Sequence, residues 1–160
     1  MPVRQLREFL DNNKIKYVNL THSVAYTAQE IAALTHTKGK ELAKTVIVKM
    51  DDALAMAVLP ASFHVSLESL KSAMRVSRVS LATEGDFRAR FPGCETGAMP
   101  PFGNLFDMPV FVDRALTKDG EIAFNAGTHH ELIRMAYADF ERLVQPKVLD
   151  FAAGARSHAA

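Results

Sequence analysis

Two apolar runs rich in β-branched residues, separated by two aspartates, constrain the fold of this chain most. Residues 42–50 and 53–59 flank Asp51-Asp52. A short polar turn between two such runs is typical of a β-hairpin. Pro60 cannot donate a hydrogen bond to a strand ladder, so the second strand should end there. The sequence therefore predicts an antiparallel strand pair near the middle of the chain.

A Gly- and Pro-rich segment at residues 91–109 is expected to form a long, shaped loop. Residues 92–104 hold three glycines and three prolines in thirteen positions, which prevents regular secondary structure. Loops of this length inside compact domains are usually functional or disordered. The apolar residues Phe91, Met99 and Phe102 argue against disorder, because such side chains need a core.

Shorter patterns on both sides of these segments predict further helices and strands. Apolar residues recur at helical spacing after Val3, Ser66 and Thr83 are potential N-caps, and Thr27–Glu30 has the capping-box pattern. The other expected elements are strands at 15–20, 76–82, 109–113, 122–125 and 131–137 and a helix over 139–144. Because helices and strands do not alternate strictly, an α+β fold with a mixed or mostly antiparallel sheet is favoured. We expect one domain over residues 1–150 and a flexible tail over 151–160.

Composition and charge exclude several classes of protein. The 160 residues carry 19 basic and 18 acidic side chains, a formal charge of +1 that is far from the strong basicity of many duplex-DNA binders. A single cysteine excludes an intramolecular disulfide framework. The sequence shows neither a signal-peptide core nor an apolar run long enough to span a bilayer. We therefore expect a cytoplasmic protein that contacts neither a membrane nor duplex DNA.

Lys44 stands near the start of the most apolar predicted strand, where lysine is uncommon. Lysine is almost never fully buried without a partner, so its stem could cover the edge of the core while the ammonium reaches water. The alternative is a cation at the mouth of a pocket that binds a phosphate or a carboxylate. The residues alone leave both interpretations open.

The stretch Gly97–Gly103 is the second candidate for function. Glycine lets the backbone approach a ligand and Pro100-Pro101 stiffens the loop, so its N–H groups could form an oxyanion site. An ordinary surface turn would have the same composition.

The six histidines and the one cysteine form no metal or nucleophile motif. Cys94 has no CxxC partner, and no histidine pair stands four residues apart beside a glutamate, so neither a metal nor a cofactor is expected. His129 and His130 are adjacent, and on extended backbone only one of them would enter a given pocket. Cys94 could be a nucleophile, but no neighbouring residue identifies its base. The absence of P-loop, GxGxxG, GxSxG and HExxH motifs disfavours nucleotide hydrolases, dinucleotide oxidoreductases and serine esterases.

Several short motifs, taken in order, resemble the YbaK/ProX family. They are His22, Thr27–Glu30, Ala43-Lys44-Thr45, Val58–Ala61, Phe91–Glu95, Gly97–Gly103 and Val110–Asp113. Each motif is weak alone, whereas their order and spacing over about residues 15–145 are specific. Members of this family are free-standing relatives of the editing domain inserted in bacterial prolyl-tRNA synthetase.

The resemblance implies a barrel-like mixed sheet surrounded by short helices, and the removal of wrongly attached amino acids from tRNA. It implies catalytic roles for Lys44, which would position the tRNA 3′ end, and for Gly97, in a loop that contacts the aminoacyl group. The substrate-binding residues that it implies are His22, Tyr26, Thr27, Thr45, Ala98, Met99, Pro100, Pro101, Gly127 and His129. The resemblance implies mischarged tRNA as the main partner and an aminoacyl-tRNA synthetase as a second partner. It implies no cofactor.

The chemistry of an aminoacyl ester agrees with this set of residues. The ester is already activated, so a positioned water and a stabilised oxyanion suffice for hydrolysis. We therefore expect a trans-acting aminoacyl-tRNA deacylase, in which water or the substrate's own side chain attacks. Two other interpretations stay open: a non-catalytic module that binds aminoacyl or nucleotide ligands, and a small-molecule esterase that uses Cys94 or a histidine.

Overall fold

The computed structural model describes residues 4–23, 30, 33 and 41–153 of the chain. Its strands are β1 (Tyr17–Thr21), β2 (Ala43–Met50), β3 (Ala53–Pro60), β4 (His64–Val65), β5 (Val79–Leu81), β6 (Val110–Asp113), β7 (Glu121–Asn125), β8 (Glu131–Ala136), β9 (Lys147–Leu149) and β10 (Ala152–Ala153). The α-helices are α1 (Arg4–Asn12), α3 (Leu67–Met74), α4 (Glu84–Phe87) and α5 (Tyr137–Val144), and the 3-10 helices are η2 (Arg88–Arg90), η3 (Gly103–Leu105) and η4 (Arg114–Lys118). None of the helices in these ranges has the length and apolar character needed to cross a bilayer.

The predicted central hairpin is confirmed. Strands β2 and β3 pair antiparallel along their whole length, and the second strand ends at Pro60 as expected. Asp51 and Asp52 both have positive φ, at 45° and 73°, as a tight hairpin turn of the favoured hand requires. The Asp51 carboxylate also accepts hydrogen bonds from the amides of Ser77 and Arg78. Those two amides are therefore not used in a ladder, and β5 begins only at Val79 rather than at residue 76.

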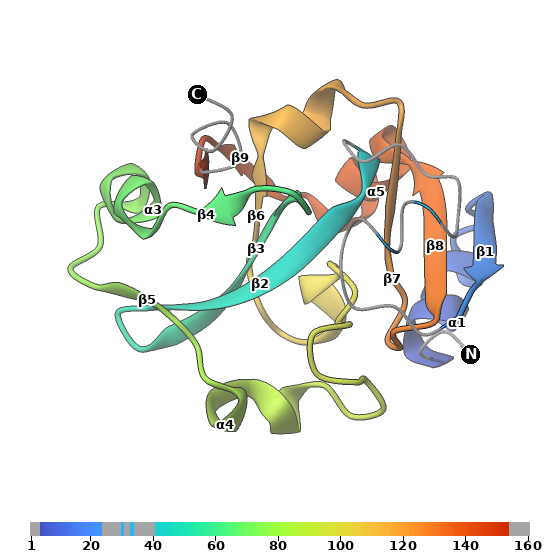
Figure 1. Ribbon diagram of the computed structural model, residues 1–160, viewed down its shortest axis with the longest axis horizontal. Coiled ribbons are helices and arrows are strands. Elements are labelled where there is room, and N and C mark those ends of the chain that lie inside the picture. Colours follow the sequence, from blue (N-terminus) through green and yellow to red (C-terminus); the bar gives the residue numbers. More distant parts are fainter. Residues whose placement is uncertain (1–3, 24–29, 31–32, 34–40, 154–160) are drawn as a thin grey trace.

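The strands form three sheets, and the α+β class is confirmed. The five-stranded sheet has the order β5-β2-β3-β6-β9, the three-stranded sheet the order β1-β8-β7, and β10 pairs with β4. Strands β3, β6 and β9 run parallel, whereas the other pairs are antiparallel, so the sheet is mixed and mostly antiparallel as predicted. The expected barrel, however, is not closed. Strands β5 and β9 are edges, and β2 meets β7 through one parallel bridge, Leu42–Ala123, before the two strands diverge (Figure 1).

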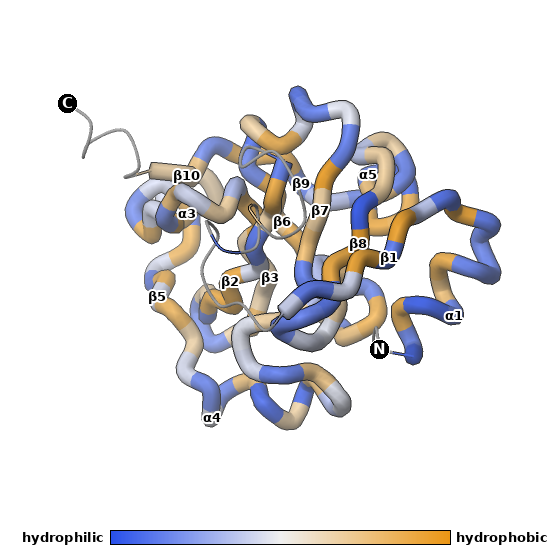
Figure 2. Tube along the Cα trace, turned by 45° about the vertical axis from the view of Figure 1, so that its right-hand side comes forward, coloured by the Kyte–Doolittle hydropathy of each residue, from blue (hydrophilic) through white to orange (hydrophobic). Residues whose placement is uncertain are grey.

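The main core lies between the two larger sheets and is centred on an aromatic residue of the long loop. Phe102 has no exposed surface, and its ring lies 6.2 Å from that of Phe9 and 5.5 Å from those of Phe124 and Phe140. Each such ring pair contributes about 0.5–1.5 kcal/mol beyond its buried area. Figure 2 shows the hydrophobic colour along β2, β3, β6 and β7, with hydrophilic residues on α4. The loop is therefore anchored in the core, as its apolar residues indicated.

The local helix signals are confirmed and some element boundaries differ. Ser66 caps α3, and Thr83 forms a capping box at the start of α4. The first strand begins at Tyr17 rather than at residue 15, because Ile15 is buried in the core behind a positive-φ residue, Lys14. The sequence patterns missed β4, β9 and β10 and the 3-10 helices. The capping box at 27–30 lies mostly outside the described residues.

A buried carboxylate joins β6 to the end of the described chain. Asp113 is 6% exposed and accepts hydrogen bonds from the amides of Phe151 and Ala152 at 2.8 Å and of Ala115 at 2.9 Å. Phe151 is buried and β10 follows it directly. Packing therefore continues past the boundary expected at residue 150, at least to Ala153.

Replacing Asp113 by Ala should release this C-terminal segment. One oxygen of Asp113, Oδ1, accepts both C-terminal hydrogen bonds, so the substitution must remove that acceptor, and a hydrogen bond to a charged acceptor contributes roughly 1.5–3 kcal/mol. We expect Asp113→Ala to lower the free energy of unfolding by at least about that amount and to speed hydrogen exchange at the Phe151 amide. The control Asp150→Ala removes only an exposed ion pair with Arg114 and should change little. Unchanged exchange in Asp113→Ala would contradict the role of this carboxylate.

Gly103 packs where no side chain fits. A methyl group on its α-carbon would overlap the backbone oxygen of Met108 and the side chain of Val110. Because overpacking typically costs about 1–3 kcal/mol, Gly103→Ala should lower the free energy of unfolding by that amount in a denaturant titration. Gly120→Ala is the matched control, since nothing lies within 4 Å of its added methyl. Equal stabilities of the two variants would show that this packing is not as tight as described.

Candidate functional site

The predicted glycine-rich loop lies against the turn that joins β7 to β8, residues 126–130, here called the hairpin turn. The amide of Glu95 donates to the Gly127 carbonyl at 2.8 Å, and the amide of Gly127 donates to the Ala98 carbonyl at 2.9 Å. Gly127 has a φ of +98°, a conformation that favours glycine. These two bonds hold segments that are distant in the sequence as one unit. Gly97, Ala98 and Gly127 are therefore brought together as the resemblance implied.

His129 packs directly on Gly97. A methyl group added to Gly97 would lie 3.5 Å from His129 Cε1, so the ring covers the face of this glycine. The His129 amide donates to the Glu95 carboxylate at 2.6 Å, and Nε2 lies 2.9 Å from the Thr96 carbonyl. A carbonyl only accepts, so Nε2 carries the proton in this arrangement. The imidazole is thereby fixed in position and in tautomer.

The amides of the loop differ in their availability. The Ala98 amide already donates to the Glu95 carbonyl at 3.0 Å. The Gly97 amide contacts only the Met99 sulfur, at 3.2 Å, and a thioether is a weak acceptor. Gly97 is exposed, whereas Ala98 to Pro101 are buried. Of the two amides, that of Gly97 is the one that can turn to a ligand.

Lys44 lies half-buried on β2, with no counter-charge among the described residues. Burial lowers the pKa of its ammonium below the ordinary value of 10.5. No hydrogen bond or ion pair joins Lys44 to another described residue. A desolvated cation without a partner is costly, so this position is suited to bind an anion.

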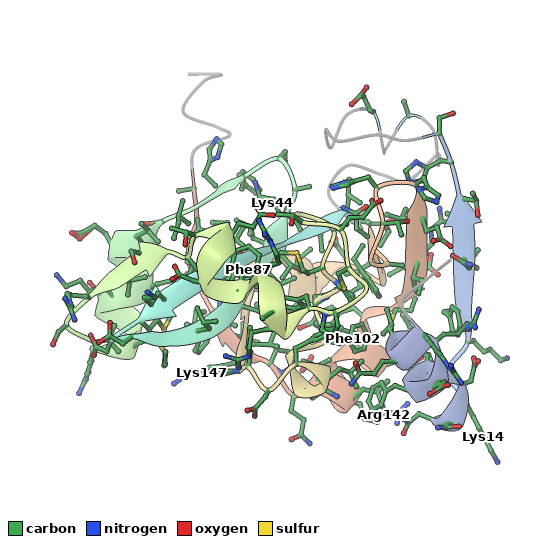
Figure 3. The ribbon with its side chains drawn as sticks, turned by 90° about the horizontal axis from the view of Figure 1, so that it is seen from below. Lys14, Lys44, Phe87, Phe102, Arg142 and Lys147 are labelled. Atoms are coloured by element: carbon green, nitrogen blue, oxygen red, sulfur yellow. The ribbon has the colours of Figure 1, made fainter. Side chains whose placement is uncertain are left out.

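Strand alternation separates Lys44 from Thr45. Thr45 pairs with Val58, which belongs to the main core, whereas Lys44 pairs with Leu59, on the other face of the sheet. Figure 3 shows Lys44 and Phe102 on opposite sides of the β2 ribbon. Adjacent strand residues point to opposite faces, so the two predicted site residues do not line one surface together.

The face that carries Lys44 continues onto the three-stranded sheet. Leu42, Ala123 and Leu132 form a buried apolar cluster on the side of that sheet opposite the main core, with Leu20 packed against it. We call this side the Leu132 face. Leu42 is two residues before Lys44 and therefore lies on the same side of β2. Lys44 thus shares a side of β2 with one member of this cluster.

His22 joins this region at the end of β1. Its amide donates to the carbonyl of His130 in the hairpin turn at 2.9 Å, and its Nδ1 lies 2.7 Å from the Ser23 carbonyl. Its Nε2 is buried and has no hydrogen-bond partner in the described part of the chain. Tyr26 and Thr27, which the resemblance also implied, lie outside the described residues.

Sequence reasoning missed two residues of this region. The Glu95 carboxylate holds His129, and its place in the Phe91–Glu95 motif was the available signal. Asn125, the last residue of β7, precedes the hairpin turn and has a buried, unpartnered Oδ1 atom. No motif marked it.

Two other features contribute nothing to this site. A hollow of about 610 Å³ lies between the β2–β3 turn, α3 and β5, and it contains none of the predicted site residues. Burial raises the pKa of the Cys94 thiol to about 11, so it is protonated at neutral pH. A thiol in that state is a poor nucleophile.

Among the described residues, no group of three or more His, Cys, Asp or Glu could hold a metal ion.

Comparison with known proteins places this arrangement in a family. The family model of the aminoacyl-tRNA editing domain matches residues 22–143. The multifunctional Ser/Thr-tRNA deacylase ProXp-y of Escherichia coli strain K12 is 28% identical over 137 residues, covering 82% of this chain and 81% of that protein.

Two solved structures share the fold. The hypothetical protein APE2540 has a TM-score of 0.82 at 20% identity, covering 94% of this chain and all of the other. A protein described as a candidate trans-editing enzyme for prolyl tRNA synthetase has a TM-score of 0.80 at 21% identity, covering 94% and 96%. The family model spans most of the sequence and includes Lys44, the glycine-rich loop and the hairpin turn. The chain therefore belongs to the aminoacyl-tRNA editing domain family, in agreement with its resemblance to YbaK/ProX proteins.

Proposed function

We propose that this chain, by family a hydrolase of aminoacyl-tRNA esters, acts in trans on mischarged tRNA and releases the wrongly attached amino acid. The half-buried, unpaired cation of Lys44 is the observation that carries the proposal. A tRNA 3′ end supplies the missing counter-charge as a phosphate. Contact through one such cation agrees with the formal charge of +1 on the whole chain.

The Gly97 loop supplies the second half of the proposal. In hydrolysis, water adds to the ester carbonyl, negative charge develops on the carbonyl oxygen, and the ribose oxygen leaves with a proton. The Gly97 amide could stabilise that charge by turning from the Met99 sulfur to the oxyanion, a stronger acceptor. His129, fixed against Gly97, keeps the loop in place for this contact.

The amino acid removed is proposed to be small and hydroxylated. The relative ProXp-y carries the name of a Ser/Thr-tRNA deacylase. The test is a panel of mischarged tRNAs, on which we expect fast loss of serine or threonine.

Replacing Lys44 by Met should impair catalysis without loss of stability. A hydrogen bond to a charged group contributes roughly 1.5–3 kcal/mol, so kcat/KM for deacylation should fall about 10- to 100-fold. Removing a cation whose pKa is lowered by burial relieves its desolvation, so the melting temperature at neutral pH should stay equal or rise. The exposed Lys16→Met is the control for charge removal.

Binding of a CCA oligonucleotide tests the same contact directly. Loss of one phosphate contact to a single strand should reduce the slope of log affinity against log salt by about 0.7 in Lys44→Met. Because the lowered pKa removes the Lys44 charge at a lower pH than an ordinary lysine, affinity should fall as pH rises toward 10.5 in the parent only. Parental deacylation rates in Lys44→Met would exclude this lysine from the mechanism.

Gly97→Ala should slow deacylation more than Gly93→Ala. Both glycines have positive φ, at 88° and 84°, so an added methyl causes similar backbone strain. Nothing lies within 4 Å of a methyl on Gly93, whereas one on Gly97 would stand against the His129 ring, next to the amide proposed to contact the oxyanion. We expect a loss of kcat of at least about 10-fold in Gly97→Ala alone, measured in single turnover. Equal effects would assign the loop a purely structural role.

A further inference from the structure

Asn125 carries a side-chain carboxamide that forms no hydrogen bond within the described part of the chain. Its Oδ1 atom is buried. Leaving a buried acceptor unsatisfied costs about 1–3 kcal/mol, and native structures contain few such groups. An apolar residue at this position would avoid that cost. The observation therefore points to a ligand group that completes the hydrogen bonds of the carboxamide.

Strand alternation places Asn125 on the Leu132 face. Its neighbour Phe124 belongs to the main core, whereas Ala123, two residues earlier, belongs to the cluster of the Leu132 face. Asn125 lies directly opposite Leu132 in the β7–β8 ladder, and Leu132 lies opposite Leu20 in the β1–β8 ladder. Opposed residues of an antiparallel pair share a face. The carboxamide thus stands at the end of a row formed with Leu132 and Leu20 across the three strands.

The same face brings Asn125 to the level of Lys44. The parallel bridge joins Leu42 to Ala123, and β2 and β7 leave it in the same direction. Lys44 and Asn125 each stand two residues beyond this bridge, on the same side of their strands. Asn125 also directly precedes the hairpin turn that holds the Gly97 loop. It therefore adjoins the turn that holds the loop of the proposed oxyanion contact.

The two polar ends of the Asn125 carboxamide favour a hydroxyl as the ligand group. A carboxamide offers both an acceptor and a donor, and a hydroxyl can satisfy both, whereas an ammonium only donates.

We propose that Asn125 is a specificity-determining residue that binds the side-chain hydroxyl of the aminoacyl group. Oδ1 accepts the hydroxyl proton and the amide nitrogen donates to the hydroxyl oxygen. This inference rests on the proposed deacylase function and deepens it. A site that hydrogen-bonds a substrate hydroxyl discriminates against the analogue that lacks it, because its polar groups are then left unpaired.

The test compares seryl and alanyl esters of one tRNA body, with the parent protein and with Asn125→Ala and Asn125→Leu. We expect Asn125→Ala to lower kcat/KM for the seryl ester about 10-fold and to leave that for the alanyl ester within about twofold. The leucine variant keeps the volume of the side chain and removes both polar ends, so it should show the same loss of preference. Neither variant should melt at a lower temperature, since each removes an unsatisfied polar group.

Controls separate the possible failures. Asn19→Ala, an exposed asparagine on β1 of the same sheet, should change neither rate. If the parent releases no amino acid from any ester of a wider panel, the proposed function fails. If the parent is active and Asn125→Ala slows both esters equally, Asn125 binds a group that they share and the inference is wrong. Unchanged rates on both esters would also overturn it.

Discussion

The parallel bridge between Leu42 and Ala123 is the contact on which the geometry of the proposed site depends. It joins the five-stranded sheet to the three-stranded sheet, and the two strands that it connects leave it in the same direction. Lys44 on one sheet and Asn125 on the other each lie two residues beyond the bridge, and Asn125 directly precedes the hairpin turn that holds the glycine-rich loop. Because the strands diverge after this bridge, the barrel stays open and the space between them is not filled by a continuous ladder.

Stability and function make opposite demands on this part of the molecule. Within the described ranges, Lys44 carries a half-buried charge without a partner, and Asn125 keeps a buried acceptor unsatisfied. Each costs folding free energy that an apolar residue would not. The surrounding structure compensates through aromatic packing around Phe102 and through backbone hydrogen bonds at Gly127. The rigid core therefore supports a locally unfavourable polar surface, as expected for a site whose ligand supplies the missing interactions.

The sequence predicts those parts of the fold that depend on neighbouring residues. The β2–β3 hairpin and the cap at Ser66 follow from local backbone preferences, and both are present as expected. The open barrel and the C-terminal strands β9 and β10 could not be predicted. They depend on contacts between distant segments, such as the hydrogen bonds from the C-terminal segment to Asp113. The motifs grouped Thr45 with Lys44 and the loop, although strand alternation turns Thr45 to the other face. Asn125 carried no signal, since an isolated asparagine becomes informative only when its hydrogen bonds can be counted.

A structure of the protein with a non-hydrolysable seryl-amide analogue of the tRNA CCA end tests the central claim most directly. Our account predicts that the terminal phosphate lies within hydrogen-bond distance of Lys44 Nζ, and that the seryl carbonyl faces the Gly97 amide with its side chain on the Leu132 face. An analogue bound instead in the hollow between α3 and β5, with Lys44 left unpaired, would contradict it.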